Sequence, residues 1–179
     1  MFEKFLKESF ESHLEIARKI IKEEKADNNK FYKFGFFDFD DTLYEKEGNY
    51  IIESTDQYRK IVELLEDPEP CYIAIVTARR SDTKDFVFDT LNNNLQDLLE
   101  VFQGKFEIKT VLDNAVEDKP SIYEVSRLKA EAINNIITNN SDNLQETLVY
   151  FYDDIQENVE EVAKELDKLN IDTSNCFIV

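Results

Sequence analysis

Short apolar runs typical of buried strands alternate with segments of helical periodicity along this chain of 179 residues. Two of these runs, residues 33–39 (KFGFFDF) and 71–76 (CYIAIV), are almost continuously apolar. Such runs favour strands that are buried on both faces, as in a parallel sheet. Parallel strands that alternate with helices are joined by right-handed crossovers, which place helices on both faces. The chain is therefore expected to fold as an α/β sandwich of three layers.

The other elements follow from apolar spacing and from capping residues. Strands are expected at residues 33–39, 71–76, 106–112, 148–152 and 176–179, and a hairpin at 43–52. Helices are expected at residues 2–26, 54–65, 81–102 in one or two pieces, from 121 or 126 to 137, and 155–169. These assignments divide the chain into an N-terminal amphipathic helix, residues 1–30, which packs on the core, and one α/β domain, residues 31–179.

The formal net charge of −18 restricts the partners that the chain is expected to bind. A surface this acidic disfavours extended contacts with nucleic acids and with anionic membranes, and it favours divalent cations. Two cysteines do not indicate a disulfide framework. No apolar stretch approaches 18 residues, and the N-terminus does not resemble a signal peptide. We therefore expect a cytoplasmic protein outside the membrane, and the sequence leaves its oligomeric state open.

Charged and hydroxyl side chains lie at the ends of three of the predicted strands or directly after them. They are Asp38, Asp40 and Asp41 after the first strand, Thr77, Arg79 and Arg80 after the second, and Asp153 and Asp154 after the fourth. Ligands of parallel α/β sheets bind beyond the carboxyl ends of the strands, so these side chains are expected to meet at one edge. Crowded carboxylates are costly unless a cation shares their charge or one of them keeps a proton. Oxygen ligands without His or Cys favour Mg²⁺ over zinc.

Each of these groups alone also has a purely structural explanation. The acidic residues after the first and fourth strands are typical of helix caps. Thr77 suits a helix entry, and Arg79 with Arg80 suits the exposed start of a helix. The joint occurrence of the groups, each directly after a predicted strand, favours a functional site over three unrelated caps.

The same residues resemble the motifs of the haloacid dehalogenase superfamily of phosphohydrolases. Residues 36–43 (FFDFDDTL) resemble its first motif, residues 73–77 (IAIVT) its second, and residues 149–154 (VYFYDD) its fourth. The third motif of the family is a lysine near a helix start, which Lys129 matches, 24 residues before Asp153. The resemblance extends over residues 33–179, and it implies a Rossmann-like domain with strand order 5-4-1-2-3.

The resemblance also implies a role for each site residue. Asp38 is the nucleophile, Asp40 the general acid and base, Thr77 a ligand of the phosphoryl group, and Lys129 the cation that offsets the charge of Asp38 and phosphate. Mg²⁺ is held by Asp38, by the backbone carbonyl of Asp40 and by Asp153, with Asp154 beside it or bound through water. Arg79 and Arg80 bind substrate by analogy with relatives that act on nucleic-acid ends.

The lysine is the least constrained of these assignments. Lys119 and Lys109 are weaker candidates, because Lys119 precedes a proline in a polar loop and Lys109 lies inside a predicted strand. A helix that starts near Ser126 points its first turn, and Lys129, at the carboxyl edge of the sheet. A helix that starts near Ser121 favours Lys119 and leaves Lys129 on the surface.

The family resemblance makes two further predictions. Because the implied order separates the second and fifth strands by two others, Cys71 and Cys176 lie about 14 Å apart and both thiols are free. The chain leaves no room for a substantial cap domain, which implies a large or exposed phosphorylated substrate. Two alternatives stay open: a polynucleotide-end or nucleotide phosphatase, and a non-catalytic binding protein with the same fold.

Overall fold

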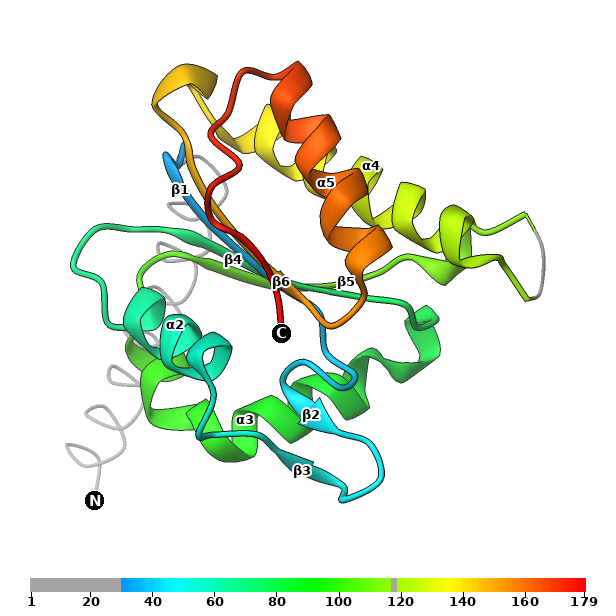
Figure 1. The fold of residues 1–179 in the computed structure, drawn as a ribbon. Helices are drawn as coiled ribbons and strands as arrows, with labels where there is room; N and C mark the ends of the chain where they lie inside the picture. The colour runs from blue at the N-terminus through cyan, green and yellow to red at the C-terminus, as the bar shows by residue number, and fades with distance from the viewer. Residues whose placement is uncertain (1–29, 117–118) are drawn as a thin grey trace, which may run out of the picture.

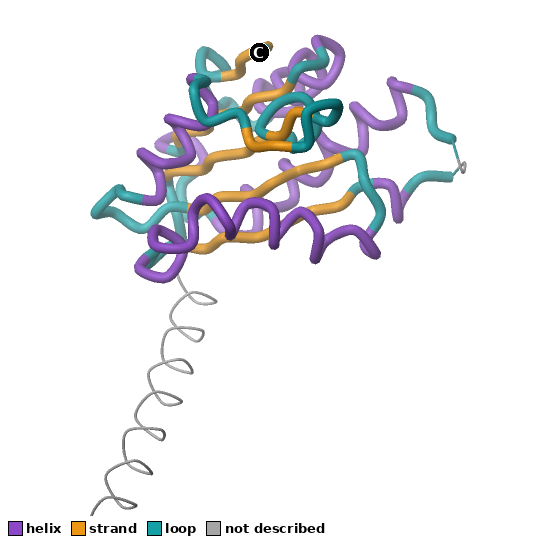
Figure 2. Tube along the Cα trace, turned by 90° about the horizontal axis from the view of Figure 1, so that it is seen from below, coloured by secondary structure: helices purple, strands orange, loops and turns teal. Residues whose placement is uncertain are grey.

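The structure is a computed structural model that describes residues 30–116 and 119–179 (Figure 1). The predicted helix at residues 2–26 lies outside the described residues. A five-stranded sheet forms the centre, and helices lie on both sides of it (Figures 1 and 2). The predicted α/β class with a parallel sheet is thereby confirmed.

All neighbouring strands of the sheet are parallel. The strands are β1 (Lys33–Phe37), β4 (Tyr72–Thr77), β5 (Lys105–Thr110), β6 (Leu148–Asp153) and β7 (Cys176–Ile178). Their order is β5-β4-β1-β6-β7, so β1 lies at the centre, flanked by β4 and β6. The implied order 5-4-1-2-3 counted only the five strands of the sheet. The hairpin after β1 adds β2 (Tyr44–Glu45) and β3 (Tyr50–Ile51), so the observed order carries the numbers 5-4-1-6-7.

Alternate side chains of β1 pack into two separate hydrophobic clusters, one on each face of the sheet. Phe34 and Phe36 face α4 (Ile122–Asn140) and α5 (Gln156–Lys168), whereas Phe37 faces α2 (Asp56–Leu65) and α3 (Lys84–Val101). Gly35 allows a close approach on the second face, because a Cβ there would lie 2.4 Å from the side chain of Leu64. The central strand is thus buried on both faces, as its apolar run predicts.

Two helices resolve alternatives that the sequence left open. Helix α3 runs unbroken through its three consecutive asparagines, so it is one piece. Helix α4 starts after Ser121, whose side chain accepts a hydrogen bond from the backbone N–H of Glu124 at 3.2 Å. The hydroxyl that caps the helix is therefore that of Ser121, and Ser126 lies one turn further in. Short 3₁₀ turns, η1 (Ser81–Thr83), η2 (Leu112–Asn114) and η3 (Leu144–Glu146), complete the fold.

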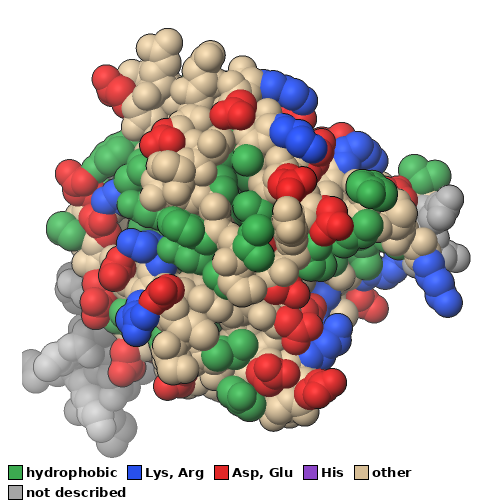
Figure 3. Space-filling model, viewed as in Figure 1, with side chains coloured by type: hydrophobic (Ala, Val, Ile, Leu, Met, Phe, Trp, Pro, Cys, Tyr) green, Lys and Arg blue, Asp and Glu red, His purple; other side chains and the backbone are tan. Residues whose placement is uncertain are grey.

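Both cysteines are free, which confirms the prediction. Burial raises the pKa of Cys71 to about 12 and that of Cys176 to about 11, so neither thiol ionises readily near neutral pH. Acidic and basic side chains are interspersed on the face shown in Figure 3, with hydrophobic side chains in a band across its middle. Among the described helices, none has the length and apolarity that crossing a membrane requires.

Candidate active site

The chain turns sharply where β1 ends. The backbone N–H of Asp38 still donates to the carbonyl of Tyr152 on β6, at 2.9 Å. The N–H groups of Leu43 and Tyr44 then both donate to the carbonyl of Phe39, at 3.0 and 2.9 Å, which closes a tight turn. Within it, Asp41 adopts the left-handed conformation (φ 59°) that Asp tolerates better than most residues. This turn keeps Asp38 and Asp40 at the same edge of the sheet.

Lys129 lies between two of the predicted carboxylates. Its Nζ is 2.7 Å from Oδ2 of Asp153, to which it donates a hydrogen bond, and 2.8 Å from Oδ1 of Asp38. Lys129 is 1% exposed, Asp38 4% and Asp153 0%, so this ion-pair cluster is shielded from water. The structure therefore brings together the predicted nucleophile, metal ligand and lysine.

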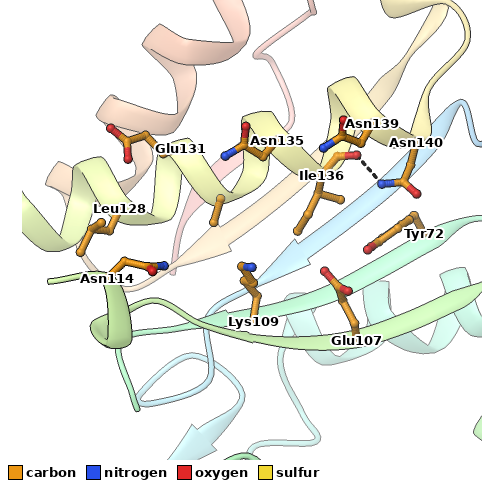
Figure 4. A pocket seen from close by; sticks show the side chains of 11 residues that line it. Tyr72, Glu107, Lys109, Asn114, Leu128, Glu131, Asn135, Ile136, Asn139 and Asn140 are labelled. Carbon is orange, nitrogen blue, oxygen red and sulfur yellow. Dashed lines mark hydrogen bonds between the residues drawn. The ribbon is translucent and has the colours of Figure 1, made fainter. Parts of the chain in front are cut away.

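The expectation that an early start of α4 leaves Lys129 on the surface is wrong. Helix α4 lies along the face of the sheet, with Leu128 and Ile133 in its buried side, and this side carries Lys129 to Asp38. Lys119 is exposed. Lys109 lines a groove of about 460 Å³ between α4 and β5, where Figure 4 shows it beside Asn114 and below α4. Only Lys129 of the three candidates contacts the predicted carboxylates.

The buried charges change each other's pKa values. Burial raises the pKa of Asp38 to about 7; Lys129 opposes this rise, and the nearby charge of Asp153 adds to it. Burial alone would lower the pKa of Lys129, but the charges of Asp38 and Asp153 outweigh it and raise that pKa. Burial raises the pKa of Asp154, and the nearby charge of Asp153 raises it further. The lysine is thus held as a cation, whereas the carboxylates are crowded.

Three carboxylates form a group that fits a divalent cation. Oxygen atoms of Asp38, Asp153 and Asp154 all lie within 4.8 Å of one another. With all three ionised, they carry three negative charges against the single positive charge of Lys129, which leaves a deficit of two. Because the donors are all oxygens, the group suits Mg²⁺ better than a softer metal.

Hydrogen bonds hold the two acidic residues at the end of β6, Asp153 and Asp154, in place. Oδ1 of Asp153 accepts from Nδ2 of Asn158 at 2.8 Å and from the backbone N–H of Ile155 at 3.0 Å. The backbone N–H of Asp154 donates to the hydroxyl of Thr42 at 3.1 Å. Thr42, which is fully buried, therefore ties the turn after β1 to the end of β6.

Asp40 is paired with a residue that was expected to bind substrate. Nε and Nη2 of Arg79 lie 2.8 and 2.6 Å from the two carboxylate oxygens of Asp40, in a bidentate pair. The guanidinium also lies over the rings of Phe39 and Phe86, 5.3 and 5.1 Å from their centroids. Hydrogen bonding to Asp40 raises the pKa of Arg79. The sequence placed Arg79 at the correct edge but did not indicate this partner.

The two remaining predicted residues, Thr77 and Arg80, differ in burial. Thr77 ends β4, one strand from β1, and its hydroxyl is buried and has no hydrogen-bond partner among the described residues. Arg80 is exposed and lies close enough to Asp113 to lower the pKa of that carboxyl, although hydrogen bonds from Ser81 contribute more. Thr77 thus presents a buried hydroxyl at the end of the strand next to β1, whereas Arg80 is exposed.

Between β1 and β4 the structure contains only the β2–β3 hairpin and α2. The ring of Tyr44 on the hairpin stacks on Phe39 at a centroid distance of 4.9 Å, which anchors the hairpin to the turn.

Comparisons of this chain with protein-family models, with curated proteins and with solved structures found no match.

Proposed function

We propose that this protein is a Mg²⁺-dependent phosphomonoester hydrolase that forms an aspartyl phosphate on Asp38. The observation that carries the proposal is the buried Lys129 held between Asp38 and Asp153 at the ends of neighbouring parallel strands. A lysine in this place offsets the charge of the nucleophile and of an incoming phosphate. With its three carboxylates ionised, the cluster carries two more negative charges than positive ones, which favours a bound divalent cation.

In the proposed reaction, an oxygen of Asp38 attacks phosphorus and the bond from phosphorus to the ester oxygen breaks. Asp40 gives its proton to the leaving oxygen and then, as a carboxylate, takes a proton from the water that hydrolyses the acyl phosphate. Inorganic phosphate leaves, and Asp38 is regenerated. The free hydroxyl of Thr77 supplies a hydrogen bond to a phosphoryl oxygen.

The same residues provide a place for Mg²⁺. The carboxylates of Asp38, Asp153 and Asp154 would hold it, together with the backbone carbonyl of Asp40. When bound, Mg²⁺ supplies the two positive charges that the carboxylates lack and neutralises charge on the phosphate. Lys129 and the hydrogen bonds to Asp153 keep the ligands in place when phosphate arrives.

We propose a large or exposed phosphate ester as the substrate, because only a hairpin and one helix stand between the first two motifs. Contacts of Arg79 and Arg80 with a substrate phosphate are part of this proposal. The second candidate, a polynucleotide-end or nucleotide phosphatase, is favoured by these arginines beside Thr77 and opposed by the net charge of −18. A cytoplasmic location, where thiols stay reduced, suits the two free cysteines.

Hydrolysis of p-nitrophenyl phosphate tests the proposal. Activity is expected with Mg²⁺ and not with EDTA, and borohydride trapping followed by mass spectrometry should locate the phosphoryl group on Asp38. The same assay with nucleotides, phosphorylated oligonucleotide ends and phosphopeptides separates the substrate classes. A protein that binds Mg²⁺ but hydrolyses none of these esters would instead be a non-catalytic binding protein.

A further inference from the structure

A buried hydrogen-bond chain connects helix α4 to the candidate site through α5. The hydroxyl of Ser126 on α4 lies 2.7 Å from Oδ1 of Asn158 on α5. Nδ2 of Asn158 lies 2.8 Å from Oδ1 of Asp153. Ser126 is 2% exposed and the other two are 0% exposed, so water does not compete for these bonds. The sequence indicates Ser126 only as a possible start of the helix that carries Lys129.

The donor and the acceptor of each hydrogen bond in this series follow from the chemistry of the groups. An ionised Asp153 only accepts hydrogen bonds, so Asn158 must present its NH₂ group to it and its carbonyl to Ser126. The Ser126 hydroxyl has one proton and two acceptors in reach, Oδ1 of Asn158 and the carbonyl of Ile122 at 2.9 Å. Since the carbonyl of Ile122 already accepts an intrahelical bond, a hydrogen bond from the Ser126 hydroxyl to Oδ1 of Asn158 stabilises the structure more than one to Ile122.

We propose that Ser126 is a positioning residue, which fixes the orientation of the Asn158 amide and thereby sets the Mg²⁺ affinity of the site. The inference rests on the proposed function. The Asn158 amide and the backbone N–H of Ile155 occupy Oδ1 of Asp153 and turn Oδ2 toward Lys129. Without the Ser126 hydroxyl, the carbonyl of the amide loses its hydrogen-bond donor, so the amide is held at one end only and can rotate out of line with Asp153. Oδ1 of Asp153 would then lose a well-aligned donor, and the carboxylate would shift.

The first experiment measures Mg²⁺ affinity by titration calorimetry on the full chain after EDTA treatment. Ser126→Ala is expected to weaken Mg²⁺ binding about tenfold, in the range typical of residues that orient metal ligands. Ser121→Ala is the matched control. It makes the same substitution at the cap of the same helix, but Ser121 is not part of the hydrogen-bond chain from Ser126 to Asp153. It is expected to bind Mg²⁺ as the wild type does. Equal affinities of wild type and Ser126→Ala would overturn the inference.

A second pair of variants separates the hydroxyl from side-chain volume. Ser126→Thr and Ser126→Val have nearly the same shape, but only Thr keeps the donor. Ser126 lines a hollow of about 220 Å³ between α4 and α5, which offers space for an added methyl group. Thr is expected to retain Mg²⁺ affinity and Val to lose it. Equal Mg²⁺ affinities of the two variants would show that the hydroxyl is not what matters.

A third measurement does not depend on the metal. In the metal-free protein, the side-chain NH₂ signals of Asn158 in NMR spectra are expected to shift and to exchange faster in Ser126→Ala, and not in Ser121→Ala. Unchanged signals would overturn the inference. A wild type that binds no Mg²⁺ would overturn the proposed function and the claim about affinity, while these signals would still report whether Ser126 orients the amide.

Discussion

Two groups of charges at the carboxyl edge of the sheet differ in how they are balanced. Asp40 and Arg79 form a one-to-one bidentate pair, in which each side chain is 19% exposed. Lys129 instead stands alone among the carboxylates of Asp38, Asp153 and Asp154 and is buried. The pair satisfies itself, whereas the cluster is short of two positive charges.

This difference indicates which group is held in place by its own pairing and which invites a further cation. A paired charge at the rim fixes the geometry of its neighbours at little cost. Crowded carboxylates, of which Asp38 and Asp153 are buried and Asp154 is half-buried, lower the stability of the metal-free fold, and a cation or a proton relieves this.

Replacing the proposed nucleophile should have the largest effect on activity. Asp38→Asn is expected to lower turnover by roughly a thousandfold or more, because an amide oxygen does not form the acyl phosphate. Hydrolysis of p-nitrophenyl phosphate measures the loss, and circular dichroism checks that the fold is intact. Asp172→Asn, on an exposed carboxyl near the C-terminus, is the matched control. Activity of Asp38→Asn within tenfold of wild type would rule out the assignment.

Removing the buried cation should come next. Lys129→Ala is expected to lower the rate at least about a hundredfold. It should also destabilise the fold by about 3–5 kcal/mol, because the carboxylates then stay buried without their partner. The same substitution at Lys109 and at Lys119 should leave both quantities near the wild-type values. An inactive Lys119→Ala with an active Lys129→Ala would contradict the site.

A change at the metal ligand should act mainly through the cation. Asp153→Asn is expected to raise the Mg²⁺ concentration needed for half-maximal activity by roughly tenfold or more, because it removes one charged ligand. Titration of activity with MgCl₂ measures this shift, and Asp172→Asn again provides the control. A Mg²⁺ titration that matches the wild type would mean that Asp153 is not a ligand.

The smallest effect concerns the stability of the metal-free protein and its pH dependence. The pKa of Asp38 is about 7 in the folded protein, above the ordinary value of 3.8, so folding favours its protonated form. Wild-type stability should therefore fall as pH rises between about 4 and 7. Asp38→Asn does not ionise, so it should exceed the wild type in stability by about 1–2 kcal/mol at pH 8 and by less at pH 5.

The matched variant in the balanced pair should act in the opposite direction. Asp40→Asn is expected to destabilise the fold by about 1 kcal/mol at pH 8, because it leaves Arg79 without its anion. Urea unfolding in EDTA, at both pH values, measures the two variants. If Asp38→Asn and Asp40→Asn changed the free energy of unfolding in the same direction, the contrast between the two groups would not hold.

Features that depend on neighbours along the chain could be predicted from the amino-acid sequence alone. The apolar runs predict the strands within one or two residues, because a strand buried on both faces needs a continuous apolar segment. The sequence also places Asp38, Thr77 and Asp153 at strand ends, and parallel strands bring such ends to one edge of the sheet. These inferences require only local periodicity and the rule of parallel crossovers.

Which side chains meet across that edge depends on how the helices and strands pack together, and this could not be predicted from the sequence. Lys129 lies on the side of α4 that faces the sheet, and it is therefore buried beside Asp38. This orientation of α4 matters more for the contact than the residue at which the helix starts. The pairing of Arg79 with Asp40 and the bond from Ser126 to Asn158 join residues that lie 39 and 32 positions apart. Such contacts depend on the packing of separate elements to within a few tenths of an ångström, and no periodicity in the sequence encodes that distance.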